Sequence, residues 1–344
     1  MHARSEPACA VENAEPMLSV RNLRVHYRSS RFGIERDVKA VDDVSFAVRR
    51  REIYGLAGES SAGKTTLTKS IAGAVRPPMV FVGGSVDFAF LSGYGGLHRA
   101  PPAEVARIRW RHLAYIMQSS MSLLNPVRQL RSTFIDFAYP HIGGSRSQFE
   151  QEVVAHLARV QLDPSVLAAY PHQLSGGMRQ RAILALATIC RPDLLIADEP
   201  TSALDVLVQR EVLGMIRGIQ RETGSSVLLV SHDMGVHALA TDRLGIMYAG
   251  RLVEEGATPE IFRSPLHPYT RHLISSLPRI GDDAPHEGLE SAPPNLADPP
   301  SGCRFHPRCP LAREACRRQV PPMQEAAPGR RVACFALETG HRDE

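Results

Sequence analysis

The amino-acid sequence predicts an α/β fold built on a buried parallel sheet. Three short apolar runs, at residues 53–57, 194–197 and 227–231, are rich in Ile, Leu and Val, and each is followed directly by polar residues. Such runs are typical of strands that are covered on both faces. Between the first run and the helical stretch after it lies a glycine-rich segment, which is the usual punctuation of a strand, loop and helix unit.

That glycine-rich segment has the pattern of a phosphate-binding loop. Gly58-Glu59-Ser60-Ser61-Ala62-Gly63-Lys64-Thr65 fits G-x-x-x-x-G-K-[ST]. Gly58 and Gly63 let backbone N–H groups turn inward around phosphate, and the start of the following helix adds further free N–H groups. We therefore expect Lys64 to bind the β- and γ-phosphates of a nucleotide and the Thr65 hydroxyl to ligate Mg²⁺.

Two acidic residues follow the second apolar run. Asp198 ends the strand expected there, so its carboxylate emerges at the sheet edge where the Mg²⁺ ion would lie. Glu199 is one residue further on and is placed to orient and deprotonate the attacking water. An isolated Asp-Glu pair would equally suit a helix cap or a solvated turn, but here it follows Lys64 by 134 positions in a chain that carries the other elements.

His232 follows the third run and is predicted to point into the same crevice. It can hydrogen-bond the γ-phosphate or Glu199, although a lone histidine is more often a satisfied polar residue. Ser175-Gly176-Gly177 opens a helix expected from about Met178 to Cys190, with Ser175 as its N-cap and exposed amides that suit an anion. A phosphate bound at Lys64 cannot also contact the start of this helix within one chain. The contact requires a second copy of the fold, so two such domains are expected to close on ATP.

In this order and spacing the chain resembles the ATP-binding subunits of ABC transporters over roughly residues 17–275. The resemblance implies a RecA-like P-loop nucleotide-binding domain with a helical subdomain, and a head-to-tail dimer that sandwiches two ATP molecules. The matching segments are Gly58–Thr65 as Walker A, Gln118 as the Q-loop glutamine, Leu174–Gln180 as the signature, Leu194–Glu199 as Walker B, Ser202–Asp205 as the D-loop and His232 as the switch histidine.

The resemblance also assigns roles residue by residue. It implies catalytic roles for Lys64, Gln118, Glu199 and His232, and Mg²⁺ ligation by Thr65, Gln118 and Asp198. Tyr27 matches the adenine-stacking aromatic, and an ordinary strand tyrosine is a close alternative. The residues expected to contact nucleotide are Tyr27, Gly58, Glu59, Ser60, Ser61, Ala62, Gly63, Lys64, Thr65, Thr66, Gln118, Asp198, Ser175, Gly176, Gly177, Gln180 and Asp205.

The chain departs from the family pattern at a few positions. Ser61 stands where a glycine is usual, so a backbone angle that glycine takes freely is expected to cost about 1 kcal/mol there. Arg51 replaces a glycine that is usual in the turn before Glu52. Ser119 and Ser120 replace an acidic residue and a proline after Gln118, which changes the local contact with a membrane partner. None of these departures removes a catalytic group.

The motifs and the resemblance imply three regions, and the length of the chain agrees with them. Residues 1–16 are expected to form a flexible tail, residues 17–266 the nucleotide-binding domain with a helical subdomain at about 101–180, and residues 267–344 an extension. A composition that is 43% apolar supports a sizeable core, and a net charge of +4 without a basic stripe gives nucleic-acid binding little support. No apolar run approaches the length of a membrane span, and the N-terminus lacks a secretory stretch, so the chain is not expected to form a pore by itself. The resemblance implies that it is peripheral to the cytoplasmic face of the inner membrane.

The extension is expected to carry a cysteine cluster. Cys303, Cys309, Cys316 and Cys334 lie in the last 42 residues and are separated by five, six and seventeen residues, which fits neither a zinc ribbon nor a ferredoxin. Together with His267-Pro268-Tyr269-Thr270-Arg271, this region resembles the C-terminal extension of oligopeptide, dipeptide and nickel importer ATPases. The resemblance implies a [4Fe–4S] cluster, with Zn²⁺ and metal-free thiols as the alternatives.

The resulting functional hypothesis is the energy-coupling ATPase of a bacterial ABC importer for di- or oligopeptides. Its implied partners are two transmembrane permease subunits, a second ABC ATPase that is identical or a paralogue, and an extracytoplasmic solute-binding protein. Importers of nickel or another small solute are an alternative, because the sequence does not disclose the cargo. Two further alternatives are a soluble ABC ATPase of DNA repair or translation and an iron–sulfur redox protein regulated by ATP.

Overall fold

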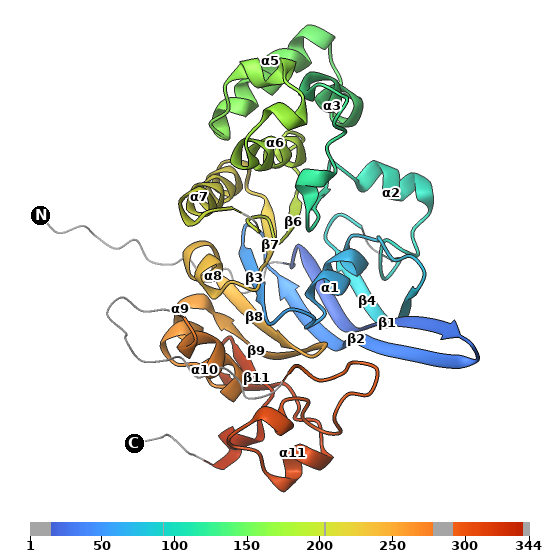
Figure 1. Ribbon diagram of the computed structural model, residues 1–344, viewed down its shortest axis with the longest axis vertical. Helices are drawn as coiled ribbons and strands as arrows, with labels where there is room; N and C mark the ends of the chain where they lie inside the picture. The colour runs from blue at the N-terminus through green and yellow to red at the C-terminus, as the bar shows by residue number, and fades with distance from the viewer. Residues whose placement is uncertain (1–14, 92, 203, 278–291, 340–344) are drawn as a thin grey trace, which may run out of the picture.

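The computed structural model describes residues 15–91, 93–202, 204–277 and 292–339 and centres on an eight-stranded sheet (Figure 1). The strand order is β10-β11-β9-β8-β3-β7-β6-β5. Five neighbouring strands are parallel, which confirms the predicted parallel sheet and its buried runs. The parallel strands are β3 (Ile53–Ala57), β5 (Leu113–Ile116), β6 (Leu194–Asp198), β7 (Ser226–Val230) and β8 (Arg243–Tyr248).

The chain also forms a second sheet, which is antiparallel. It has the order β2-β1-β4 and is formed by β1 (Leu18–Arg31), β2 (Ile34–Val48) and β4 (Met79–Phe88). Apolar side chains from this sheet, from β3 and from helix α1 (Lys64–Ile71) share one buried cluster, which includes Leu23, Leu56 and Leu67. The phosphate-loop segment is therefore held between two sheets.

Helices flank the parallel strands and fill the region predicted to be a helical subdomain. That region, residues 101–180, also contains β5, which belongs to the main sheet, so the helical part is not continuous there. The remaining helices are α2 (Pro102–Ile108), α3 (Leu130–Phe137), α4 (Tyr139–Ile142), α5 (Arg146–Arg159), α6 (Gly176–Thr188), α7 (Val206–Thr223), α8 (Met234–Ala240), α9 (Thr258–Arg263), α10 (Pro268–Ser275) and α11 (Glu314–Arg318).

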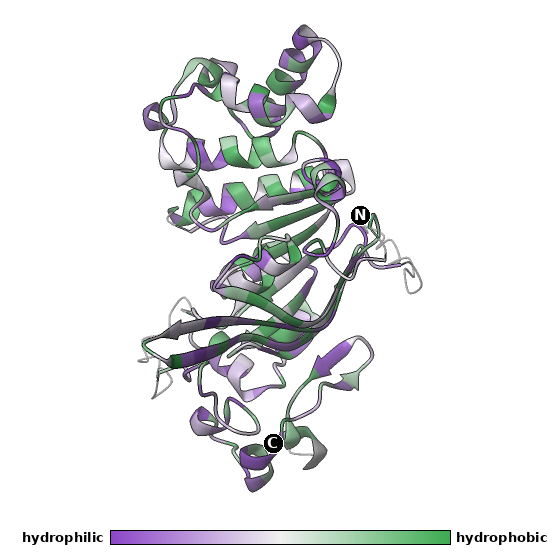
Figure 2. Cartoon of the chain, turned by 90° about the vertical axis from the view of Figure 1, so that its right-hand side faces the viewer, coloured by the Kyte–Doolittle hydropathy of each residue, from purple (hydrophilic) through white to green (hydrophobic). Residues whose placement is uncertain are grey.

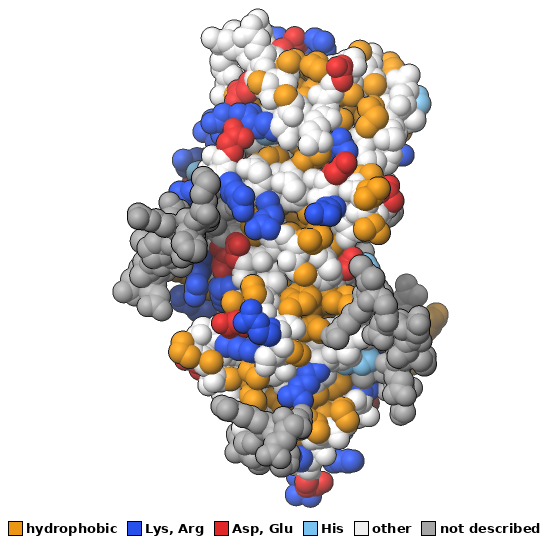
Figure 3. Space-filling view, turned by 90° about the vertical axis from the view of Figure 1, so that its left-hand side faces the viewer, with side chains coloured by type: hydrophobic (Ala, Val, Ile, Leu, Met, Phe, Trp, Pro, Cys, Tyr) orange, Lys and Arg blue, Asp and Glu red, His pale blue; other side chains and the backbone are white. Residues whose placement is uncertain are grey.

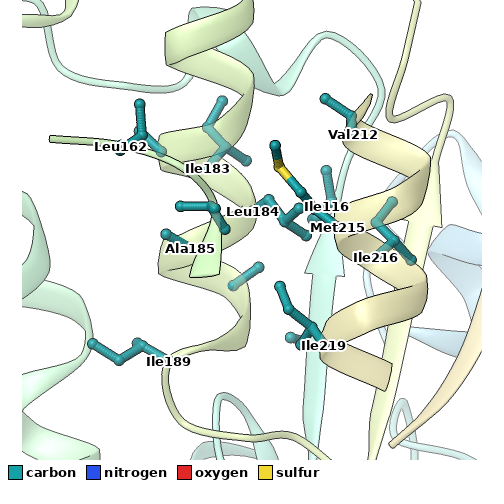
Figure 4. Close-up of a cluster of buried hydrophobic side chains, with 14 of the residues drawn as sticks. Ile116, Leu162, Ile183, Leu184, Ala185, Ile189, Val212, Met215, Ile216 and Ile219 are labelled. Atoms are coloured by element: carbon teal, nitrogen blue, oxygen red, sulfur yellow. The ribbon is translucent and has the colours of Figure 1, made fainter. Parts of the chain in front are cut away.

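Helices α6 and α7 are packed against each other and against the sheet by branched apolar side chains (Figure 4). Leu184 of α6 and Ile216 of α7 are 0% and 1% exposed, and Ile116 of β5 joins them. Figure 2 shows the same segregation in the central strands, which are coloured hydrophobic, whereas the ends of the molecule carry more polar residues. This packing fixes the position of α6 relative to the strand ends, and with it the position of the signature segment.

The C-terminal residues are built into the same sheet. Strand β9 (Arg251–Ala257) is antiparallel to β8, and β11 (Arg330–Val332) pairs with β9, with β10 (Gln324–Ala327) at the edge. The aromatic rings of Tyr248, Tyr269 and Phe305 lie with centroids 4.6–5.5 Å apart, which joins β8, α10 and the cysteine-bearing segment. The extension is thus packed onto the nucleotide domain and shares its sheet.

Among the residues that the structure describes, no helix combines the length and the apolar character needed to cross a bilayer. On the face shown in Figure 3, basic side chains form several groups that are interspersed with hydrophobic and acidic ones.

Three buried histidines make the stability of this fold depend on pH. Burial lowers the pKa of His156 and of His237 to about 4, and that of His267 to about 3. Below about pH 6.5 the unfolded chain binds protons on these rings while the folded chain does not, so the free energy of unfolding falls as the pH drops from about 6.5 towards 4. Each histidine contributes a slope of up to about 1.4 kcal/mol per pH unit in this window.

Chemical denaturation at pH 7 and pH 5 checks this expectation. Because the Nε2 atom of His156 lies 3.0 Å from the Thr188 hydroxyl, His156→Gln keeps a polar group there while removing the titration. The variant is expected to be less stable at pH 7 but to lose less stability than the wild type on acidification. The exposed His172→Gln serves as the control and should follow the wild type. Equal losses in His156→Gln and the wild type would contradict the assignment.

Candidate functional site

The loop between β3 and α1 has the backbone geometry that its glycines predict. Gly58 has φ 151° and Gly63 has φ 99°, both in the range that favours glycine. A Cβ at Gly58 would lie 2.1 Å from the carbonyl oxygen of Met247, and one at Gly63 would lie 2.0 Å from that of Ala40. Because backbone atoms block both positions, only glycine fits, and the loop is seated against β8 and β2.

Lys64 is buried at the first residue of α1, inside this loop. Its ammonium donates hydrogen bonds to the carbonyl oxygens of Gly58 at 2.6 Å and Glu59 at 2.9 Å. Burial lowers the pKa of Lys64, and the carboxylates of Glu199, Asp198 and Glu59 oppose that shift. The positive charge of Lys64 therefore lies near acidic side chains at the end of β6 and in the loop, and this position suits contact with phosphate oxygens.

Asp198 is fully buried at the carboxyl end of β6 and faces the start of α1. One carboxylate oxygen accepts from the Thr68 hydroxyl at 2.9 Å and the Tyr115 hydroxyl at 3.3 Å, and the other lies 3.3 Å from the Thr65 hydroxyl. Burial raises the pKa of Asp198, and these hydroxyl hydrogen bonds oppose the shift. Thr65 and Asp198, both predicted Mg²⁺ ligands, thus lie side by side with the hard oxygen donors that Mg²⁺ prefers.

Thr68 and Tyr115 are partners of Asp198 that the sequence analysis did not identify. Thr68 lies three residues after Thr65 on the same helix, so both hydroxyls share one face of α1. Tyr115 lies on β5, the strand next to β6, and its hydroxyl is also 3.2 Å from that of Thr68. The helical spacing would have suggested Thr68, whereas Tyr115 depends on strand order, which the sequence does not state.

Glu199 and His232 form a hydrogen-bonded pair beyond the ends of β6 and β7. One Glu199 carboxylate oxygen accepts from the backbone N–H of His232 at 3.0 Å and lies 2.9 Å from its ring Nδ1. The glutamate side chain is 8% exposed, whereas the histidine side chain is 59% exposed. The glutamate is therefore fixed in direction while the imidazole remains accessible, which suits a general base held by a group that can also contact a ligand.

The other predicted site residues fall into two groups. Tyr27 on β1 lies with its hydroxyl 3.2 Å from that of Thr66, beside the phosphate loop. Gln118 lies in an exposed turn after β5. The signature residues lie on α6 with the other helices in the upper part of Figure 1, apart from α1. The single chain therefore brings together the Lys64 side of the site but leaves the signature elsewhere.

The signature helix itself has the cap that was predicted. Ser175 is the N-cap of α6, which begins at Gly176, and its hydroxyl accepts from the backbone N–H of Met178 at 3.2 Å. Gln180 is buried in the same helix, and Asp205 caps α7 by accepting from Val208 N–H at 3.0 Å. Within the D-loop segment, Ala203 lies outside the described residues.

Glu59 has partners from the C-terminal part of the chain. Its carboxylate accepts two hydrogen bonds from the Arg308 guanidinium, at 3.0 Å and 3.2 Å, and its backbone N–H donates to the Tyr269 hydroxyl at 2.8 Å. The sequence placed Glu59 among the nucleotide contacts. Nothing in the sequence indicated that a residue 249 positions away would pair with it.

Ser61, Arg51 and Ser119 all have left-handed backbone conformations, with φ values of 68°, 60° and 61°. This conformation costs a non-glycine residue about 1–2 kcal/mol. Ser61 is exposed, so replacing it loses little contact. We expect Ser61→Gly to raise the free energy of unfolding by up to about 1 kcal/mol, after allowance for the freer unfolded chain. Urea denaturation measures this gain, and Ser61→Ala, which retains the strain, should show none.

Cys303, Cys309, Cys316 and Cys334 line one small cavity, together with apolar groups such as Phe305. All four are free thiols, and burial raises the pKa of Cys303 and Cys309 to about 11. The four cysteines that the sequence analysis grouped therefore border the same cavity. Their side chains are not arranged as a ligand set, however: in the part of the chain that the structure describes, no group of three or more His, Cys, Asp or Glu could hold a metal ion.

Comparison with known families and relatives agrees with this geometry. The ABC transporter family model matches residues 41–202, and the model of the oligopeptide/dipeptide transporter C-terminal region matches residues 253–316. The chain is 36% identical over 329 residues to the oligopeptide transport ATP-binding protein OppD of Salmonella typhimurium, covering 95% of each chain. It is 39% identical over 324 residues to the dipeptide transport ATP-binding protein DppD of Bacillus subtilis, covering 93% of this chain and 95% of that one.

Solved structures agree on the fold. A dimeric ATP-binding cassette in a post-hydrolysis state with ADP and phosphate superposes with a TM-score of 0.60 and 22% identity, over 70% of this chain and 99% of that chain. With its phosphate loop, its buried Asp198 and its Glu199–His232 pair, the chain is an ATPase, for which ATP is the substrate and Mg²⁺ the expected metal ion. It belongs to the ATP-binding subunits of ABC transporters, in the oligopeptide/dipeptide transporter family.

Proposed function

We propose that this chain is the energy-coupling subunit of a bacterial importer for di- or oligopeptides. The observation that carries the cargo class is the match of residues 253–316 to the oligopeptide/dipeptide transporter C-terminal region. It is supported by relatives that are named for peptide transport and align with at least nine-tenths of the chain. The nucleotide site supports hydrolysis, because a buried carboxylate, a phosphate loop and a fixed glutamate meet at the same strand ends.

In the proposed reaction Glu199 acts on the attacking water. The Glu199 carboxylate takes a proton from the water as its oxygen attacks the γ-phosphorus, and the bond to the bridging oxygen breaks to give ADP and phosphate. His232 holds that carboxylate in direction through the 2.9 Å contact. Lys64 holds the β- and γ-phosphate oxygens, and Tyr27 is proposed to stack against the adenine. Thr65, Asp198 and Gln118 would hold Mg²⁺, which neutralises developing phosphate charge when bound.

The signature residues of the chain serve a nucleotide bound to a partner. Ser175, Gly176 and Gly177 place free backbone N–H groups at the start of α6, and this 13-residue helix adds its dipole. In the proposed assembly they contact the γ-phosphate held by a second ATPase subunit, with Gln180 and Asp205 near the same interface. ATP binding then joins the two subunits, and hydrolysis releases them.

The partners follow from the role of the subunit. The chain is proposed to act at the cytoplasmic face of the membrane, bound to two transmembrane permease subunits that receive solute from an extracytoplasmic binding protein. The second ATPase is either an identical copy or a paralogue. Nucleic acid has no place in this assembly.

We propose further that the cysteine cavity is a metal site, a [4Fe–4S] cluster first and Zn²⁺ as the alternative. The convergence of four free thiols on one cavity supports it, and the thiols would need to approach one another further to ligate a single centre. Iron, sulfide and zinc are to be measured on the full chain purified without oxygen, alongside Cys309→Ser. About four iron and four sulfide per chain supports the cluster. The absence of both metals would contradict the proposal.

The transport role is tested with the complex reconstituted in vesicles. Labelled dipeptides, longer peptides and nickel chelates are offered at equal concentration to vesicles with the wild-type chain or with Lys64→Ala. We expect uptake of peptides that requires ATP and is lost with Lys64→Ala. Uptake of nickel in preference to peptides would overturn the cargo class while leaving the ATPase assignment intact.

A further inference from the structure

Glu59 in the phosphate loop is held from three directions. Its carbonyl oxygen accepts from the Lys64 ammonium at 2.9 Å, its N–H donates to the Tyr269 hydroxyl at 2.8 Å, and its carboxylate is paired in a two-pronged contact with Arg308. The first contact comes from the nucleotide site, and the other two come from the C-terminal extension. Glu59 therefore connects the lysine that binds phosphate with a part of the chain far away in sequence.

The groups of the extension that reach Glu59 are firmly seated. Tyr269 is 0% exposed, and its ring lies 4.6 Å from that of Tyr248 and 5.5 Å from that of Phe305. The Arg308 side chain is 6% exposed, donates to the Tyr248 hydroxyl at 3.3 Å and lies 5.8 Å over its ring. Tyr269 and Arg308 are therefore already ordered by their surroundings, so their side chains lose little further conformational entropy in holding Glu59.

Hydrogen bonds to β9 fix the segment that carries Tyr269, residues 267–271. Buried Glu254 of β9 accepts from the backbone N–H groups of Leu266 and His267, both at 2.9 Å, and so fixes the start of α10. His267 in turn caps α10 by accepting from Tyr269 N–H at 3.1 Å. The position of the Tyr269 hydroxyl is therefore set by β9 and not by a free loop.

The segment that carries Arg308 is equally short and bounded. Arg308 ends a single 3-10 turn, His306–Arg308, that lies between Cys303 and Cys309 of the cysteine cavity. A displacement of either cysteine would thus be passed to the guanidinium within a few residues. Arg308 and Tyr269 therefore join the extension directly to the phosphate loop.

We infer that Tyr269 and Arg308 are positioning residues for the phosphate loop, acting through Glu59 to hold it in the conformation that receives ATP phosphates. Without them the loop is free to leave that conformation. The apparent affinity for ATP then falls in proportion to the fraction of molecules whose loop has left it. The chemical step, which depends on Glu199, is left in place. The inference uses only ATP binding and is independent of the cargo proposal.

The experiment compares Mg-ATP affinity, ATP KM and kcat for the full chain in its complex. Tyr269→Phe removes one hydroxyl and keeps the ring in the aromatic cluster, and Arg308→Gln removes the charge. We expect the Kd and KM for ATP to rise about three- to tenfold for Tyr269→Phe and about tenfold or more for Arg308→Gln, with kcat changed less than twofold. Arg308→Lys, which keeps the charge but not the fork, should recover part of the affinity.

A matched control separates positioning from general attachment of the extension. Arg331 pairs with Glu255 at 2.9 Å and so also joins the extension to the sheet, but on β9 and away from the phosphate loop. Arg331→Gln is expected to keep wild-type ATP affinity even if its melting temperature falls. Equal losses of affinity in Arg331→Gln and Arg308→Gln, or unchanged affinity in both Tyr269→Phe and Arg308→Gln, would overturn the inference.

A double-mutant cycle decides how Glu59 itself acts. If Arg308 works through Glu59, then Arg308→Gln adds nothing further to the ATP Kd of Glu59→Gln, because the pair is already broken. If Glu59 contacts nucleotide directly and Arg308 does not depend on it, the two effects on Kd add. Additivity within experimental error would therefore overturn the route through Glu59.

Discussion

Glu199→Gln is expected to bind ATP and to retain it unhydrolysed. The amide keeps the size of the side chain but cannot take the proton from water, so hydrolysis at this site should fall by about 10²–10⁴-fold. Lys64, Thr65 and Asp198 are untouched, so ATP affinity should remain within about twofold of the wild type. Photoreactive ATP labelled on the α- or γ-phosphate and cross-linked to this chain measures the result, because a retained γ-label means that ATP has not been cleaved.

The control for this variant is Glu222→Gln, which removes an exposed carboxylate paired with Arg159 on the helical part of the chain. It should lose the γ-label at the wild-type rate. Near-normal loss of the γ-label by Glu199→Gln would remove Glu199 from the proposed role of base and leave the 2.9 Å contact with His232 as structural only.

Gly176→Asp is expected to slow hydrolysis at the partner's nucleotide by about a hundredfold or more, while leaving this chain folded and able to bind its own nucleotide. A Cβ at Gly176 meets nothing within 4 Å, and an aspartate in the first turn of α6 favours the helix dipole, so the subunit itself should not be destabilised. The new negative charge instead stands where the partner's γ-phosphate must approach. Loss of one such anion-stabilising site is expected to cost about a hundredfold or more in rate.

Gly214→Asp on α7 is the matched control, since a Cβ there also meets nothing within 4 Å. It should retain both ATP binding and hydrolysis. If Gly176→Asp hydrolyses ATP normally, or if it loses its own ATP binding while the partner's site is unaffected, the signature helix does not act on a neighbouring subunit.

The sheet and the Lys64 side of the site were predictable because their signals are local. The runs at 53–57, 194–197 and 227–231 are continuous and apolar, and each becomes a parallel strand that delivers its next polar residue to one edge. The glycine spacing predicted the loop for the same reason, because Gly58 and Gly63 each adopt a backbone angle that favours glycine. The parallel register then brought Asp198 and Glu199 towards Lys64 without any further information from the sequence.

The contacts that the sequence did not reveal are those made between distant segments. Tyr115 meets Asp198 because β5 pairs with β6, and a four-residue strand inside a helical stretch gives little periodic signal. Arg308 meets Glu59 because β9 and α10 fold the extension back over the phosphate loop. Strand β11 is three residues long and polar at its start, so its pairing with β9 could not be read from an alternating pattern.

In the proposed assembly the γ-phosphate is held by loops of two separate chains. A structure of the intact assembly of the Glu199→Gln variant with Mg-ATP measures this directly. It should place Ser175 and Gly177 of one ATPase subunit within hydrogen-bonding distance of the γ-phosphate that Lys64 holds in the other. A nucleotide-loaded assembly in which the start of α6 faces solvent, away from any triphosphate, would contradict a γ-phosphate site shared between two subunits.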